Sequence, residues 1–199
     1  MEHVSEVIAG LPVYRLLDDQ VVAYDAVRRS VGDGGSRGAK CAIIIEGGPG
    51  TGKSLIALNL LADLLRAGID ARHVTGSKAF TESLRRSVGA RASSIFGWTL
   101  SFANLPSDSV AVAIVDEAHR IRLRSANRFT PRASRTDLPQ IREILKAARV
   151  SVFFIDDLQA VRPNEIGTSA YIRENAGALG IPVREFELEI QVRCTGSGL

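Results

Sequence analysis

The feature that most constrains this chain is a glycine-rich segment from Gly47 to Ser54, which reads Gly-Gly-Pro-Gly-Thr-Gly-Lys-Ser. It fits the pattern G-x-x-x-x-G-K-[ST], with an apolar run before it that predicts a strand and a leucine-rich run after it that predicts a helix. Glycines allow successive main-chain N–H groups to curl around a phosphate, and the start of a helix adds a favourable dipole. The segment therefore predicts a phosphate-binding loop in an α/β protein.

This loop is expected to hold ATP and Mg²⁺. Lys53 would reach the β- and γ-phosphates, and the Ser54 hydroxyl would ligate Mg²⁺. The expected nucleotide-binding residues of the loop and the helix start are Gly47, Gly48, Pro49, Gly50, Thr51, Gly52, Lys53, Ser54 and Leu55.

Apolar runs and helical patterns alternate along the whole chain. Runs rich in Val, Ile and Phe predict strands at 42–46, 71–75, 110–116, 151–156 and 183–188. Leucine- and alanine-rich periodic segments predict helices at 21–31, 53–67, 78–88, 138–148 and 169–179. Such alternation is typical of a parallel sheet covered by helices on both faces. We therefore expect a three-layer α/β sandwich with five or more mostly parallel strands.

Length and composition narrow the class of protein. The chain has 199 residues, of which 45% are hydrophobic, enough for one core and too few for two large domains. We expect one domain over 1–199, with a core at 41–193 that follows an N-terminal helix and a flexible loop at 32–38. No apolar run approaches the roughly 18–20 residues that span a bilayer, and the two cysteines match no metal spacing. We expect a cytoplasmic protein without a membrane partner.

Two further predicted strands end in polar residues. Asp116 would hold Mg²⁺ through water, and Glu117 would polarise the water that attacks the γ-phosphate. After the next strand, Gln159 would read the γ-phosphate, and Asp156 would orient that phosphate or the metal shell. Because the carboxyl ends of parallel strands meet at one edge of the sheet, we expect these residues to converge on the glycine-rich loop. ATP hydrolysis is the expected reaction.

The net charge of +3 suits a polyanionic partner without requiring one. Segment 119–135 has no apolar periodicity and predicts a long basic loop. Its arginines are Arg120, Arg122, Arg124, Arg128, Arg132 and Arg135.

Phe96 and Trp98 have two open roles, base stacking and core packing, of which packing is favoured.

Taken together, these motifs resemble the first RecA-like domain of a superfamily 1 helicase. They are most similar to the Schlafen group 3-type DNA/RNA helicase domain family, and the similarity covers roughly residues 16–193. The segments that carry it are 47–54, 74–80, 115–120, 154–162 and 188–193.

The resemblance implies further site residues. Gln20 is similar to a glutamine that contacts adenine, Gln159 to one that links the γ-phosphate to the bound strand, and Arg193 to an arginine that meets the γ-phosphate. A last group resembles a motif that touches the backbone of single-stranded nucleic acid: Thr75, Ser77 and Lys78.

The resemblance also implies an activity and partners. Helicases of this kind need a second RecA-like domain, which we expect to be absent from this chain or supplied by a partner protein. The expected function is the ATP-hydrolysing N-terminal motor half of a superfamily 1-like helicase that binds single-stranded DNA or RNA, with slow turnover by this chain alone. An ATP-gated module that switches a protein partner in a defence or signalling assembly remains the alternative. A small-substrate kinase is disfavoured because Glu117 directly follows Asp116 and suits activation of water.

Overall fold

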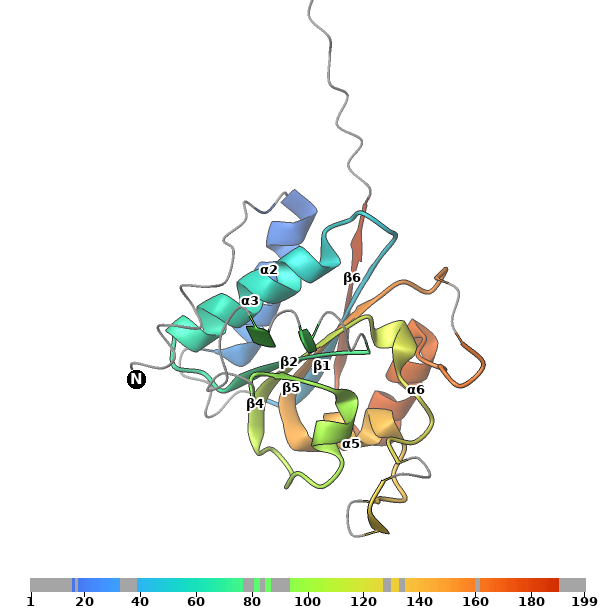
Figure 1. Cartoon of the computed structure of the whole chain (residues 1–199). Helices are drawn as coiled ribbons and strands as arrows, with labels where there is room; N and C mark the ends of the chain where they lie inside the picture. Colours follow the sequence, from blue (N-terminus) through green and yellow to red (C-terminus); the bar gives the residue numbers. More distant parts are fainter. Residues whose placement is uncertain are drawn as a thin grey trace, which may run out of the picture.

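The computed structural model describes residues 16, 18–32, 39–76, 81–82, 85–86, 94–126, 130–132, 135–159 and 162–189. Within these residues the fold is built on one six-stranded, all-parallel sheet with the order β3-β2-β4-β5-β1-β6 (Figure 1). The strands are β1 (Cys41–Gly47), β2 (Ala71–Thr75), β3 (Phe96–Gly97), β4 (Val110–Asp116), β5 (Ala148–Ile155) and β6 (Val183–Leu188). The helices are α2 (Asp18–Val31), α3 (Lys53–Arg66), α5 (Gln140–Ala147) and α6 (Ser169–Ala178), with short 3-10 helices η2 (Thr99–Phe102) and η3 (Ala118–Arg120).

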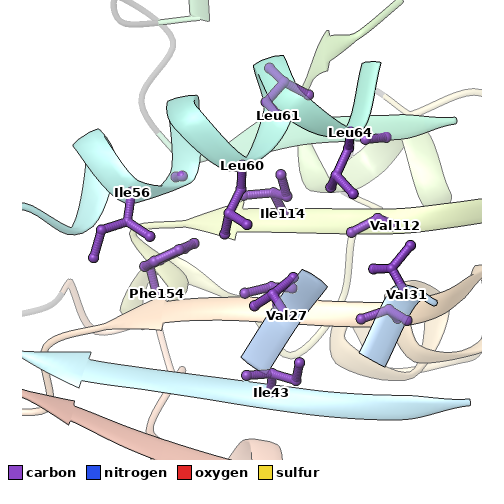
Figure 2. Close-up of a cluster of buried hydrophobic side chains, with 14 of the residues drawn as sticks. Val27, Val31, Ile43, Ile56, Leu60, Leu61, Leu64, Val112, Ile114 and Phe154 are labelled. Carbon is purple, nitrogen blue, oxygen red and sulfur yellow. The ribbon is translucent and has the colours of Figure 1, made fainter. Parts of the chain in front are cut away.

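Helices cover both faces of the sheet, as expected for a three-layer sandwich. On one face, Ile43 of β1 and Phe154 of β5 pack in a cluster with Leu60 of α3 and Val27 of α2 (Figure 2). On the other face, neighbouring residues of the same strands pack against α5 and α6, for example Ile44 against Ile144 and Ile172. Because successive strand residues are buried on opposite faces, the central strands are continuous apolar runs rather than alternating ones.

The ends of the helices follow local sequence signals. Helix α3 begins immediately after the glycine-rich loop, and Gly68, with a φ of 73°, follows its end. At α6 the Thr168 hydroxyl accepts a hydrogen bond from the Tyr171 main-chain N–H, at 3.0 Å, which is a standard N-cap. Gly180, at φ 66°, ends the turn after this helix. No described helix has the length and apolar character needed to cross a bilayer.

The structure departs from the predicted elements at strands β3 and β5. Strand β3 has only two residues, too few to produce a recognisable pattern in the sequence. Strand β5 begins at Ala148 because α5 leads directly into it, whereas the pattern predicts a start at 151. The helix predicted at 78–88 lies largely outside the described residues, as do residues 33–38 of the predicted flexible loop.

The described part of the basic segment 119–135 is held against α5 rather than standing free. The Gln140 side-chain oxygen accepts a hydrogen bond from the Arg122 main-chain N–H, at 2.8 Å. The buried Glu143 carboxylate accepts hydrogen bonds from the hydroxyls of Ser125 and Thr136. A buried carboxylate is costly unless it is hydrogen-bonded. Glu143 therefore holds Ser125 of this segment, and Thr136 directly after it, against α5.

The chain that follows β5 crosses η3 at very short range. The Ile166 main-chain N–H donates to the Ile121 carbonyl at 2.7 Å, and Arg122 and Glu165 form an antiparallel bridge. A Cβ at Gly167 would lie 2.0 Å from the carbonyl oxygen of Ala118. Only glycine permits this approach between two backbones.

We predict that Gly167→Ala lowers the free energy of unfolding by about 1–3 kcal/mol, because the added methyl group forces the two backbones apart. The matched control is Gly177→Ala in α6, where an added Cβ meets no atom within 4 Å and should stabilise the helix by about 0.5–1 kcal/mol. Urea unfolding followed by circular dichroism measures both. Equal effects of the two substitutions would contradict the close crossing.

Candidate functional site

The predicted motifs meet at the carboxyl edge of the sheet, where four adjacent strands end. β1 runs into the glycine-rich loop, β5 into Asp156, and β4 ends at Asp116. β5 lies between β1 and β4, and β2 lies on the far side of β4, where Thr75 is in register with Asp116. The strand order therefore confirms the convergence expected from the sequence.

The glycine-rich loop adopts a conformation that requires its glycines. Gly50 and Gly52 have φ values of 80° and 83°, a region that side chains other than glycine rarely occupy. A Cβ at Gly47 would lie 2.7 Å from the Thr51 hydroxyl, which itself donates to the Gly48 carbonyl at 2.9 Å. The loop is thus a tight main-chain cradle at the N-terminus of α3, which fits a phosphate group.

Lys53, the first residue of α3, lies over this loop. Its ammonium group donates hydrogen bonds to the carbonyls of Gly47 and Gly48, the second at 2.7 Å. Burial lowers the pKa of Lys53, while the carboxylates of Asp156 and Asp116 oppose that shift by favouring the charged form. The cation and two acids from neighbouring strands therefore share one electrostatic site.

Two of the predicted residues supply oxygen atoms of the kind that Mg²⁺ prefers. Ser54, the second residue of α3, is exposed at the loop. Asp116 is buried, and one of its carboxylate oxygens accepts a hydrogen bond from the Glu117 main-chain N–H at 3.0 Å. No group of three His, Cys, Asp or Glu side chains in the described residues could form a metal centre. One hydroxyl and one carboxylate fit the usual Mg²⁺ site, which takes its other ligands from phosphates and water.

Glu117 occupies a left-handed backbone conformation with φ 55° and ψ 48°. One of its carboxylate oxygens accepts a hydrogen bond from the Thr75 hydroxyl at 2.9 Å. The other lies 3.4 Å from the guanidinium of Arg120. Arg120 was not among the predicted site residues, although its position three residues after Glu117 is a signal for such a pair.

Gln20 of α2 contacts the glycine-rich loop directly. Its side-chain nitrogen donates to the Thr51 carbonyl at 2.9 Å, and a Cβ at Gly52 would lie 2.5 Å from the same nitrogen. A residue 31 positions away in sequence thus supports the loop. Contact of Gln20 with adenine stays a prediction.

The acids after β5 have different tasks. Asp156 is buried, and its carboxylate accepts a hydrogen bond from the Leu158 main-chain N–H at 3.1 Å. Asp157 faces the start of α6, where its carboxylate accepts hydrogen bonds from the main-chain N–H of Ser169, at 2.9 Å, and from the Ser169 hydroxyl. Gln159 is exposed on the turn. The structural role of Asp157 has no signal in the sequence, because its partner lies twelve residues away.

Two buried histidines flank the acids of β4. His73 of β2 has its Nε2 3.9 Å from the Asp116 carboxylate, and His119 follows Glu117 in η3. Burial lowers the pKa of both imidazoles, which favours their neutral forms. The remaining predicted site residues, Ser77, Lys78 and Arg193, lie outside the described residues.

The sequence profile described as Schlafen group 3, DNA/RNA helicase domain matches residues 40–198 of this chain. A search of curated proteins found no match.

Solved structures with a similar fold include AMPPCP-bound DnaA from Aquifex aeolicus, at 15% identity and a TM-score of 0.44, covering 87% of this chain and 48% of that chain. They also include DnaI, at 14% identity and a TM-score of 0.46, covering 96% of this chain and 90% of that one. The Hef helicase domain of Pyrococcus furiosus matches at 18% identity and a TM-score of 0.43, covering 83% of this chain and 37% of that one. The chain spans about half the length of the DnaA chain.

We predict that the neighbouring acids Asp156 and Asp157 respond differently to replacement. Asp157→Ala should lower the free energy of unfolding by about 1–2 kcal/mol, because the first turn of α6 loses its acceptor, and should leave ATP affinity unchanged. Asp156→Asn should weaken binding of MgATP, because a carboxylate that favours the charged form of Lys53 is lost. Thermal unfolding and titration with a fluorescent ATP analogue measure the two effects. A reversed pattern would contradict the assignment.

Proposed function

Since the chain belongs to the Schlafen group 3 DNA/RNA helicase domain family, we propose that it is the ATP-binding and ATP-hydrolysing N-terminal motor half of a superfamily 1-like DNA/RNA helicase. The chain is a helicase-like P-loop NTPase domain by family and by fold. The observation that carries the proposal is the meeting of Lys53, Asp116 and Glu117 at one edge of the sheet. A cation for phosphates, an acid for the metal and a second acid for water are the parts that hydrolysis of ATP requires.

Each part has a task in the proposed reaction. The glycine-rich loop and Lys53 hold the phosphates in line, while Ser54 and Asp116 hold Mg²⁺. Mg²⁺, when bound, neutralises charge on the β- and γ-phosphate oxygens. Glu117 orients water and takes its proton as the water oxygen bonds to the γ-phosphorus. The bond between that phosphorus and the bridging β-phosphate oxygen breaks in the same displacement, and ADP leaves. Gln159 and Arg193 are proposed to contact the γ-phosphate, and Gln20 to contact adenine while supporting the loop.

A single-stranded DNA or RNA is the proposed partner on the β2 side of the site. The family description supports a nucleic-acid ligand. Thr75 and Gly76 at the end of β2 line one pocket with Arg120 and Arg122. Guanidinium groups suit phosphates because their planar donors match the phosphate oxygens. Ser77 and Lys78, the next residues along the chain, are proposed to extend this contact.

A second RecA-like domain or a partner protein is proposed to complete the ATP site. Translocation requires two domains that close on ATP and open after hydrolysis. We therefore expect this chain alone to bind ATP and to turn it over slowly.

The test of the ATP site is a pair of substitutions. Lys53→Ala should abolish most ATP binding, because the phosphates lose their cation. Glu117→Gln should keep ATP binding but reduce hydrolysis by about 10²–10⁴-fold, the usual contribution of a general base. Steady-state ATPase rates with and without single-stranded DNA and RNA measure the hydrolysis of both variants. Arg66→Gln, on the exposed end of α3, is the control variant. Normal hydrolysis by the Lys53 variant would refute the assigned site.

The test of the nucleic-acid partner uses the described arginines of the basic segment. Arg122→Ala and Arg124→Ala should each weaken binding of a labelled oligonucleotide and lower the salt slope by about one. Fluorescence anisotropy over a salt series measures both quantities, and Arg66→Gln again controls for the loss of one charge. Unchanged affinity in both variants would instead favour the alternative, an ATP-gated switch for a protein partner.

A further inference from the structure

Both oxygens of the Glu117 carboxylate are engaged by groups on the β2 side of the site. The Thr75 hydroxyl donates a hydrogen bond to Oε2 at 2.9 Å. The Arg120 guanidinium lies 3.4 Å from Oε1. Thr75 is buried at the end of β2, and Arg120 belongs to η3, which begins directly after Glu117.

These contacts direct the Glu117 carboxylate toward Thr75 and Arg120. A general base must come within hydrogen-bond reach of the attacking water, and that water must lie beside the γ-phosphate over Lys53. Thr75 and Arg120 therefore compete with that water for the lone pairs of the Glu117 carboxylate.

Thr75 and Arg120, the two groups that restrain Glu117, also line a pocket of about 160 Å³. The Arg120 side chain lies along Gly76, where an added Cβ would come within 2.6 Å of its Cδ. Trp98 and Arg122 also line this pocket. A ligand in this pocket would therefore contact the same groups that Glu117 contacts.

The lining chemistry favours a phosphodiester. Two guanidinium groups and a hydroxyl can donate to phosphate oxygens, and the Trp98 ring, with the Arg85 guanidinium 4.4 Å from its centre, adds an aromatic surface. Glu165 also lines the pocket, but its carboxylate accepts a hydrogen bond from the Arg162 main-chain N–H. The volume lies below the roughly 300–1,000 Å³ of pockets that enclose whole small molecules, so it suits one segment of a polymer.

We propose that a backbone phosphate of single-stranded nucleic acid enters this pocket, competes with Glu117 for Arg120 and Thr75, and thereby frees the Glu117 carboxylate to activate water. This inference rests on the proposed function and deepens it, because it names the residues through which the strand controls hydrolysis. Binding of the strand and restraint of Glu117 exclude one another. By thermodynamic linkage, weakening the restraint must then strengthen binding of the strand, and the reverse.

The first test measures ATP hydrolysis by the full chain. Thr75→Val removes the hydroxyl while keeping the side-chain volume. It should raise the rate without nucleic acid by about 2- to 10-fold, the shift expected from the loss of one hydrogen bond, and should lower the stimulation by single strands accordingly. Thr75→Ser, which keeps the hydroxyl, should bring the stimulation back toward the wild-type ratio. If Thr75→Val slows hydrolysis with and without nucleic acid, Thr75 supports Glu117 instead of restraining it, and the proposal is wrong.

The second test does not depend on hydrolysis. Without ATP, Glu117→Gln should bind a fluorescently labelled oligothymidylate more tightly than wild type, by about 2- to 5-fold, because Arg120 loses a competing anion. Arg120→Gln should bind it more weakly than the charge-matched control Arg66→Gln. Anisotropy titrations measure all three, and thermal unfolding verifies that each variant is folded.

The two tests separate this inference from the proposed function. Single strands could stimulate hydrolysis by the wild type while Thr75→Val shows the wild-type stimulation ratio and Glu117→Gln shows the wild-type affinity for the oligonucleotide. That result overturns the inference and leaves the proposed function standing. If the chain hydrolyses no ATP, the proposed function is refuted. The oligonucleotide affinity of Glu117→Gln then still shows whether Glu117 and the strand compete for Arg120. Absence of oligothymidylate binding by the wild type overturns the inference outright.

Discussion

Parallel pairing of the adjacent strands β1, β5 and β4 places the phosphate cradle and the two buried acids at the site. Cys41 to Glu46 of β1 pair with residues 150–155 of β5, and β5 pairs in turn with β4 along most of its length. This ladder brings the glycine-rich loop, Asp156 and Asp116 to one edge although they are far apart in sequence. Side chains buried on both faces hold the ladder in one register, because a shift by one residue would reverse which face each side chain meets.

The edge created by this pairing concentrates charge in a partly buried place. Asp116 and Asp156 are both nearly inaccessible, and carboxylates there are costly unless they find partners. The main-chain N–H groups of Glu117 and Leu158 donate hydrogen bonds to Asp116 and Asp156 respectively, and Lys53 supplies the opposite charge. The same groups that make the edge stable when folded are the groups that a phosphate and a metal would engage.

The β2 side of the site depends on a separate set of contacts. Gln140 and Glu143 of α5 hold the segment after η3, and the crossing at Gly167 holds η3 itself. These contacts place Arg120 beside Glu117 and Arg122 in the lining of the pocket. The nucleotide side and the pocket side of the protein are therefore joined through η3, which is only three residues long.

The sequence by itself determined the phosphate cradle, the layer architecture and the strands that carry the acids, because glycine spacing and apolar runs act locally and leave a pattern. It could not show that Glu117 bonds to Thr75, 42 residues away, or that Asp157 binds the start of α6 while its neighbour Asp156 favours the charged form of Lys53. Two adjacent acids look alike in sequence, and only the backbone turn after β5 decides where each carboxylate points. The tertiary structure decided these roles because they arise from strand order and from close crossings of backbone, which no local pattern encodes.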